Sequence, residues 1–281
     1  MQQLKTQEGL SGFSLKYLAM ALMILDHIQY FFAFTGKIPL FFSMLGRLAA
    51  PLFLFCLIEG FTHTHDRKIY FLRIYLISVL MGAIQFSFYN IGCALVRPDG
   101  FFPQNQMLAS FSILIVLLQG FEWCAQRKWG RGLAAVLLPL LLPFFAAILM
   151  TAFPYPIFQF ALNFLALTVL PCHSFIMDGG TATLLFGTVL YLSRKNRKIQ
   201  AASFVITCIL WDIVRLHLMA PDLILTDFFT MAYEWMEVFA VLPMLCYNGS
   251  RGRGSKKLFY WFYPAHIYVL YALSCLLYQL I

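Results

Sequence analysis

Long apolar stretches alternate with short polar breaks along the whole chain. Many of the stretches reach or approach the roughly 20 residues that an α-helix needs to cross the hydrocarbon core of a bilayer. Within lipid, helices satisfy all their backbone hydrogen bonds internally, which favours helical spans here. The pattern therefore predicts an all-α, polytopic membrane bundle of about ten helices, over residues 15–34, 45–63, 70–89, 106–125, 132–151, 157–171, 179–193, 200–218, 228–247 and 258–279.

The breaks are short and contain glycine, proline and basic residues, and no long polar linker or internal repeat divides the chain. We therefore expect one transmembrane domain over residues 1–281. Lys5 and Lys16 predict a cytoplasmic N-terminus, because basic loops face the cytoplasm. The segments 157–171 and 179–193 hold only 15 residues each, so one of them is a candidate re-entrant segment. With nine crossings the loops SRKNRK and SRGRGSKK face the cytoplasm, and with ten they face outside.

Composition agrees with this class of protein. Hydrophobic residues make up 61% of the chain and charged residues 11%, against about 25% charged in soluble domains. The basic loops are explained by membrane orientation, so we expect contact with lipid and no nucleic-acid partner. The seven cysteines are scattered without a C-x-x-C spacing, which predicts neither a disulfide framework nor a metal site. Nucleotide-binding glycine loops and hydrolase motifs are absent from the sequence.

Asp26 and His27 lie in the middle of the first apolar segment, where titratable side chains are costly and usually functional. Lys16 lies eleven residues earlier, which is three helical turns plus about 20°, so Lys16 and His27 share one helix face about 16 Å apart. Asp26 points about 100° away from His27 and needs its own partner. In a hairpin that turns near residue 39, Arg47 lies at a similar depth, so we predict an Asp26–Arg47 ion pair.

Further polar residues flank the next loop. Glu59 and His63 share a helix face at a spacing of four residues, and Arg73 follows the loop; a helix-end polar network and a functional role both remain open. Asp178 precedes two glycines and is predicted to cap the following helix.

Two other groups of charges have short helical spacings. Asp212 and Arg215 are predicted to form a structural pair, and Glu234 and Glu237 to share a face.

The block LPMLCYNGSRGRGSKKLFYWFYPAHIYVLY is the second dense region of candidate chemistry. Its glycine-rich loop carries Arg251 and Arg253. Such a loop can hold phosphates through backbone N–H groups and charge, or bind anionic lipid headgroups, and both readings remain open. His266 follows Pro264 in the last segment, and a proline inside a helix often marks a lined cavity.

Several blocks resemble the TraX family of membrane acetyltransferases: LKYLAMALMILDHI, LGRLAAPLFLFCLIEGFTHT with RKIYFLR, LLFGTVLYLSRKNR, and LPMLCYNGSRGRG followed by KLFYWFYPAHIYVLY. The last is the most specific. TraX proteins look like distant relatives of the acyltransferase type three group. That group carries a basic residue, ten residues and a histidine in its first helix, which Lys16 and His27 match in spacing.

The resemblance implies transfer of an acetyl group from cytoplasmic acetyl-CoA to an amine, such as the N-terminal amine of a pilin-like protein. His27 corresponds to the essential histidine, with Asp26 beside it in the catalytic site. We predict that the donor is held by Lys16, Arg47, Arg251, Arg253 and His266, with supporting polar contacts from Glu59, His63, Arg73 and Asp178.

Three alternatives remain open: O-acetylation of a cell-envelope glycan, a non-enzymatic transporter that uses the buried charges, and a non-catalytic assembly factor. The expected location is a bacterial inner membrane.

Overall fold

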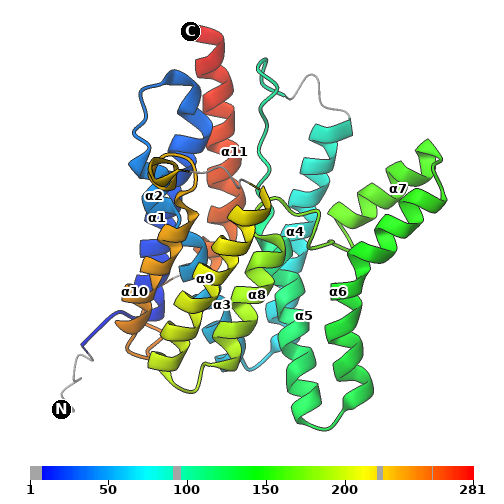
Figure 1. The fold of residues 1–281 in the computed structure, drawn as a ribbon, viewed down its shortest axis with the longest axis vertical. Helices are drawn as coiled ribbons and strands as arrows, with labels where there is room; N and C mark the ends of the chain where they lie inside the picture. Colours follow the sequence, from blue (N-terminus) through cyan, green and yellow to red (C-terminus); the bar gives the residue numbers. More distant parts are fainter. Residues whose placement is uncertain (1–7, 91–95, 220–223, 255) are drawn as a thin grey trace. The chain divides into compact units, whose positions relative to one another are not determined.

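The computed structural model describes residues 8–90, 96–219, 224–254 and 256–281 (Figure 1). It is 77% helical, and the described residues contain no β-strand, which confirms the all-α fold class. Six helical segments among the described residues are long and apolar enough to cross a membrane: Gly12–Thr35, Phe41–His63, Arg67–Asn90, Met107–Ala125, Trp129–Ala152 and Arg197–Leu218. These segments agree with a multi-pass membrane protein.

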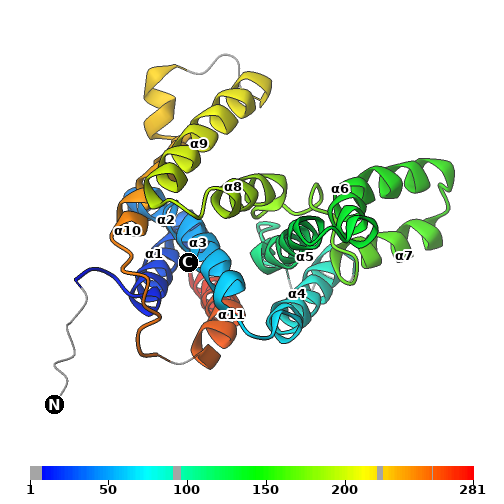
Figure 2. The ribbon, with the colours of Figure 1, turned by 90° about the horizontal axis from the view of Figure 1, so that it is seen from below.

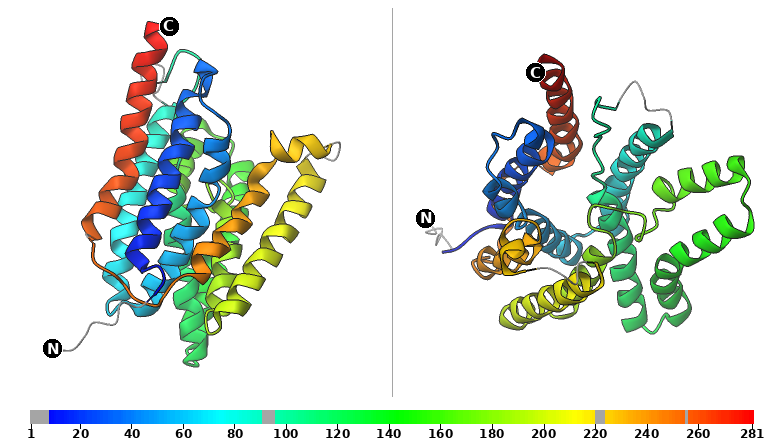
Figure 3. Two further views of the ribbon diagram at one scale, coloured as in Figure 1. Left: turned by 90° about the vertical axis from the view of Figure 1, so that its left-hand side faces the viewer. Right: turned by 45° about the horizontal axis from the view of Figure 1, so that its top comes forward.

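The chain forms two compact units, Met1–Gly60 with Val189–Phe259, and Phe61–Thr188 with Tyr260–Ile281. The first unit contains α1 (Gly12–Phe32), α2 (Phe41–Gly46) and most of α3 (Ala49–His63), followed later in the chain by α9 (Arg197–Met219). Figure 3 shows the 3₁₀-helix η4 (Tyr233–Ala240) and α10 (Val241–Leu245), in orange, running beside α9, in yellow.

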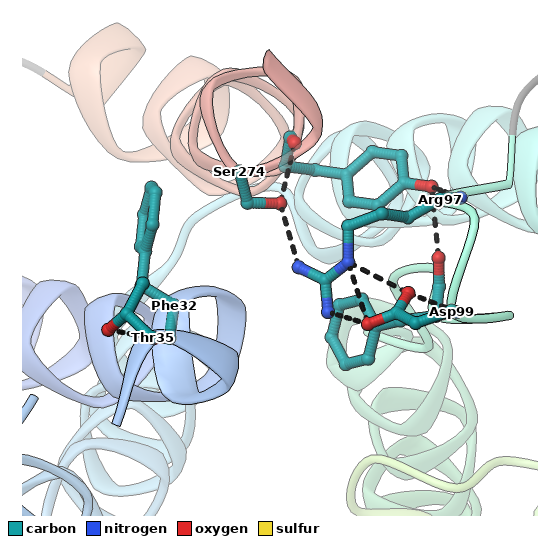
Figure 4. A network of polar contacts seen from close by, with 7 residues as sticks. Phe32, Thr35, Arg97, Asp99 and Ser274 are labelled. Atoms are coloured by element: carbon teal, nitrogen blue, oxygen red, sulfur yellow. Dashed lines mark hydrogen bonds and ion pairs between the residues drawn. The ribbon is translucent and has the colours of Figure 1, made fainter. Parts of the chain in front are cut away.

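The start and end of α1 follow from its sequence. Ser11 caps the helix, because its side chain accepts a hydrogen bond from the N–H of Ser14. The α-helix continues to Phe32 and tightens into a 3₁₀ turn, η1 (Ala33–Thr35), in which Thr35 Oγ1 donates to the Phe32 carbonyl (Figure 4). Gly36 then ends the helix with φ +65°, a conformation that glycine adopts without steric cost.

Two predicted helices differ in the structure. The segment predicted as 45–63 is divided into α2 and α3 near Arg47, because Pro51 has no N–H to donate to the Arg47 carbonyl. The prediction of a spanning helix at 228–247 is wrong, since this segment forms η3 (Leu225–Phe229), η4 and the short α10. Pro243 similarly lacks the N–H that a continuous α-helix would direct to Phe239.

The second unit contains α4 (Arg67–Asn90), α5 (Met107–Ala125), α6 (Trp129–Ala152), α7 (Pro156–Leu167), most of α8 (Gly180–Leu192) and most of α11 (Lys256–Leu280). Figure 2 shows α5 and α6 as neighbours. Their close approach requires small residues: a Cβ atom at Gly132 would overlap the Cys124 sulfur. The α7 and α8 helices contain 12 and 13 residues, too few to cross a bilayer upright.

A buried arginine fixes the loop that precedes α5 against α11. Arg97 is 4% exposed, and it forms an ion pair with Asp99 at 2.7 Å and a hydrogen bond to Ser274 Oγ (Figure 4). The Tyr271 hydroxyl accepts the backbone N–H of Arg97 and donates to the Phe101 carbonyl. The hydrogen bond from Arg97 lowers the pKa of Asp99 below its usual value.

The Asp99→Asn variant should be less stable by about 2 kcal/mol at pH 7, because it leaves the buried guanidinium without its carboxylate partner. A depressed folded-state pKa stabilises the protein above the unfolded-state pKa, and this contribution disappears as the pH falls through the folded-state value. The difference in melting temperature between wild type and variant in detergent should therefore narrow from pH 7 to pH 3. An equal difference at both pH values would contradict this assignment.

Candidate functional site

The loop of residues 247–254, here called the glycine loop, docks onto the first turn of α1. The N–H groups of Gly12 and Phe13 donate to the carbonyls of Ser250 and Arg251, at 2.8 and 3.0 Å. Leu10 just before them donates to the Cys246 carbonyl. The first turn of a helix has N–H groups without intrahelical partners, and here the loop carbonyls accept two of them.

This docking explains the glycines of the loop. Gly252 has φ +74°, and a Cβ atom there would overlap the Ser11 side chain, while a Cβ atom at Gly254 would overlap the ring of Phe13. The carbonyl groups of Ser250 and Arg251 face α1, and binding of phosphate by backbone N–H groups of the loop stays a prediction.

Two predicted cofactor residues meet at an aromatic platform formed by Phe13 and Phe259, whose ring centres lie 5.4 Å apart. The Lys16 ammonium lies 5.6 Å from the centre of the Phe13 ring and 5.1 Å from that of Phe259. The Arg251 guanidinium lies 5.7 Å from the centre of the Phe13 ring. Lys16 and Arg251 thus both lie against the Phe13 ring, and Arg253 is exposed on the same loop, while binding of the donor by these residues stays a prediction.

Glu59 has an ion-pair partner at the start of α9. Arg197 binds the Glu59 carboxylate at 2.8 Å, and its guanidinium lies over the rings of Phe55 and Tyr247. Burial raises the pKa of Tyr247, and the neighbouring Glu59 carboxylate raises it further. These contacts join the SRKNRK loop and the glycine loop to the same end of the first unit as the start of α1, here called the basic end.

This arrangement concerns the number of membrane crossings, nine or ten, that the sequence left open. The SRKNRK loop and the glycine loop lie at the end where α1 begins, which is the alternative predicted for nine crossings, with an even number of crossings before each loop.

His27 is buried, with 6% of its surface exposed, fifteen residues beyond the start of α1. The helix has no break between Lys16 and His27, so both residues keep the predicted relation. The His27 Nδ1 lies 2.8 Å from the Met23 carbonyl oxygen. Because a carbonyl only accepts, Nδ1 carries the proton and Nε2 carries the lone pair of the neutral ring. The rings of Tyr30 and Phe31 pack beside it.

The predicted Asp26–Arg47 ion pair is confirmed. Arg47 Nη2 lies 3.1 Å from Asp26 Oδ1. Ser43 donates to the same carboxylate oxygen at 2.7 Å and accepts a hydrogen bond from the hydroxyl of Tyr233. Asp26 is thereby held toward α2 and η4. The helices approach closely here, because a Cβ atom at Gly46 would overlap Asp26.

A second ion-paired group lies between α9 and η4. The Arg215 guanidinium binds Asp212, as predicted, and also Glu234, at 3.2 and 3.1 Å. Glu237 accepts a hydrogen bond from the Cys208 thiol and interacts electrostatically with Asp212, Arg47 and Arg215. The three-residue turn of η4 places Glu234 and Glu237 on one face, as their spacing predicts.

Sequence reasoning missed that these residues join the Asp26–Arg47 pair in one group. The polar spacing within α9 and η4 was visible, but the partners come from segments separated by more than 160 residues. Ser43 and Tyr233 carry no charge and gave no signal of their own.

The remaining candidates lie in the second unit. His63 and Arg73 are exposed, and Arg73 hydrogen-bonds the hydroxyl of Tyr260. Asp178 accepts a hydrogen bond from Tyr263 at 3.3 Å, while its capping role stays a prediction. His266 is 9% exposed, its Nδ1 lies 2.8 Å from the Phe262 carbonyl, and its ring stacks on that of Phe262. Tyr263 thus ties the C-terminal block to Asp178.

The chain is similar to a known protein family. The family model described as TraX protein matches residues 11–167, more than half of the chain. The chain belongs to the TraX family. The matched range of this TraX-family chain contains Lys16, Asp26, His27 and Arg47, while the glycine loop lies beyond it.

A curated relative extends the similarity to nearly the full length. The chain is 27% identical over 270 residues to a probable fimbrial assembly protein, FimC of serogroup H1, from Dichelobacter nodosus. The alignment covers 92% of the TraX-family chain and 94% of the relative. No solved structure matches.

Gly46→Ala should disturb the packing of α1 on α2 and weaken the Asp26–Arg47 pair. A methyl group there overlaps Asp26, and forced overpacking costs about 1–3 kcal/mol. The measurement is the midpoint of thermal unfolding in detergent. Gly130→Ala is the matched control, because nothing lies within 4 Å of a Cβ atom at that helical position. Equal midpoints for the two variants would contradict the close approach at Gly46.

Proposed function

We propose that this TraX-family protein is a membrane-embedded acetyltransferase that moves an acetyl group from cytoplasmic acetyl-CoA to an amine. One observation carries the proposal: a single unbroken helix bears a cation at the basic end and a buried imidazole about 16 Å further along the same face. The separation suits an extended pantetheine arm, whose anionic end and thioester lie far apart. The basic end faces the cytoplasm in this proposal, as its loops favour.

The donor's phosphates are proposed to bind Lys16 and Arg251, with Arg253 adding charge from the same loop. Two cations at one aromatic platform support this assignment, because phosphate groups bind strongly to adjacent lysine and arginine side chains. Arg47 is already held by Asp26 and Ser43, which favours a positioning role over phosphate binding. For His266, whose ring rests on Phe262, binding of the donor stays a prediction.

His27 acts as the general base in this mechanism. The acceptor amine nitrogen attacks the thioester carbonyl carbon while His27 Nε2 takes a proton from that nitrogen. The carbon–sulfur bond then breaks, and the thiolate of CoA leaves with the electron pair and receives the proton from the imidazolium. The products are an acetylated amine and CoA. The hydrogen bond from Nδ1 to Met23 supports this role, since it leaves Nε2 as the basic atom.

The proposed acceptor is an amine of a pilin-like protein, a suggestion supported by the name of the relative, a probable fimbrial assembly protein. The same name favours a second candidate function, a non-catalytic assembly factor. The two differ in whether a covalent product forms. Mass spectrometry of protein and glycan from cells with and without the gene distinguishes three functions. A gene-dependent acetylated protein supports the proposed enzyme, a gene-dependent acetylated glycan supports O-acetylation, and no acetylated product supports the assembly factor.

His27→Ala should lower acetyl transfer at least about 100-fold, because a positioned general base contributes roughly 10²–10⁴-fold to the rate. The rate of acetyl transfer is measured with radiolabelled acetyl-CoA and proteoliposomes that contain the purified protein. His217→Ala is the control, since His217 is exposed in the same unit and should be dispensable. Wild-type transfer by a folded His27→Ala protein would exclude His27 as the general base, whereas no transfer by the wild-type protein would favour the assembly factor.

The double variant Lys16→Ala, Arg251→Ala should weaken binding of CoA about tenfold or more, because both phosphate-binding cations are lost. The readout is the CoA concentration that gives half of the maximal thermal stabilisation. Lys195→Ala controls for general loss of positive charge, since Lys195 is an exposed cation in the SRKNRK loop. Equal weakening in Lys195→Ala would point to unspecific attraction instead of a phosphate site.

A further inference from the structure

The two ion-paired groups of the first unit form one cluster, here called the acid cluster: Asp26, Arg47, Asp212, Arg215, Glu234 and Glu237. Arg47 links its parts, because it binds Asp26 and interacts electrostatically with Glu237. The cluster contains four carboxyl groups and two guanidinium groups. Two carboxyl groups therefore lack a matching cation within the cluster.

Asp212 is the buried carboxyl group of the cluster. Its side chain is 7% exposed, and while Oδ1 binds Arg215, the buried Oδ2 has no hydrogen-bond partner among the described residues. A buried carboxylate oxygen without a partner is costly, since desolvation of the charge is not repaid. Glu237 lies close enough to interact with it electrostatically, so two carboxyl groups are available at this position. Among the described residues, no positively charged donor binds Asp212 Oδ2.

The depth of the cluster matches that of the candidate base. Helices α1 and α9 both begin at the basic end, and His27 and Asp212 each lie fifteen residues beyond the first residue of their helix. That number of residues corresponds to about 22 Å of helix. Asp26, next to His27 in the chain, belongs to the cluster itself. A group bound by Asp212 and Glu237 would thus lie at the level where acetyl transfer is proposed.

We propose that Asp212 and Glu237 form a binding site for a primary ammonium group, the protonated amine of the acceptor. Before the nitrogen attacks the thioester, the ammonium group gives one proton to a carboxylate of this site, and His27 takes the second proton during the attack. The identification of the ligand as the acceptor rests on the proposed function. The presence of a cation-binding site can be tested independently of that function. An ammonium group offers three N–H donors and one positive charge, which satisfies Asp212 Oδ2 and reduces the excess of negative charge. Arg47 and Arg215 hold the surrounding carboxylates in place and leave this position to the ligand.

The first test measures binding of n-octylamine to the purified wild-type protein by thermal stabilisation at pH 7, where the amine is protonated. 1-Octanol and N-octylacetamide have similar tails without the charge. Octylamine should stabilise the protein more than either control compound. Equal stabilisation by all three, or the same stabilisation by NaCl alone, would overturn the ammonium site.

Variants locate the site. Asp212→Asn and Glu237→Gln should each raise the octylamine concentration for half-maximal stabilisation about tenfold, because each removes a carboxyl group that can pair with the ammonium group as a carboxylate. Glu8→Gln is the matched control, an exposed position with the same change of charge. Wild-type affinity for octylamine in either folded cluster variant would overturn the assignment of that residue.

A covalent test covers the case in which the variants do not fold. Dicyclohexylcarbodiimide activates carboxyl groups, and a bound amine then displaces the urea and forms an amide. In the wild type, octylamide should form on the peptides that contain Asp212 or Glu237. Adducts on other carboxyl groups alone, or no adduct, would overturn the proposal.

These outcomes are separable from those of the proposed function. A protein that binds octylamine at Asp212 and Glu237 but transfers no acetyl group retains the cation site and loses the acetyltransferase. Conversely, acetyl transfer that keeps its wild-type KM for an amine in Asp212→Asn and Glu237→Gln retains the enzyme and removes this site.

Discussion

Carbonyl groups of the glycine loop accept hydrogen bonds from N–H groups in the first turn of α1. The rest of the candidate site depends on this interaction. A helix cannot begin in an apolar setting with its N–H groups unpaired. Because Ser250 and Arg251 supply the acceptors, two segments almost 240 residues apart in the chain meet. The same contact sets Arg251 beside Lys16 on Phe13 and orients α1, which carries His27 inward.

Charge inside this unit is organised by pairing. Asp26 binds Arg47, and Asp212 binds Arg215. Ser43 donates a hydrogen bond to Asp26 and accepts one from Tyr233. In a medium of low polarity an ion pair tolerates the loss of one member poorly. The imidazole of His27 is handled differently, because a backbone carbonyl fixes its tautomer and aromatic rings surround it. A histidine and an ion-paired aspartate therefore lie next to each other in the chain, and each has a different hydrogen-bond partner.

Much of this was predictable from helical periodicity, and the failures have physical causes. The helix class, the face shared by Lys16 and His27, and the Asp26–Arg47 pair follow from spacing and hairpin depth. The segment 228–247 was mispredicted because its hydrophobic run hides Pro243, which interrupts the α-helical hydrogen bonds. The partners of Glu59 and Glu237 were not predictable, since Arg197 and Cys208 reach them through tertiary packing. The roles of the glycines required coordinates, because sequence does not reveal which neighbour a Cβ atom would meet.

The sharing of the Phe13 ring by Lys16 and Arg251 has a consequence for handling the protein. Each cation lies less than 6 Å from the same ring centre, so at low ionic strength, where screening is weak, their like charges repel one another. The glycine loop that carries Arg251 also closes the start of α1, which transmits this repulsion to the helix end. Durability in detergent will consequently depend on buffer composition. Sulfate and pyrophosphate, which bridge two cations, are better suited to purification than chloride at the same ionic strength.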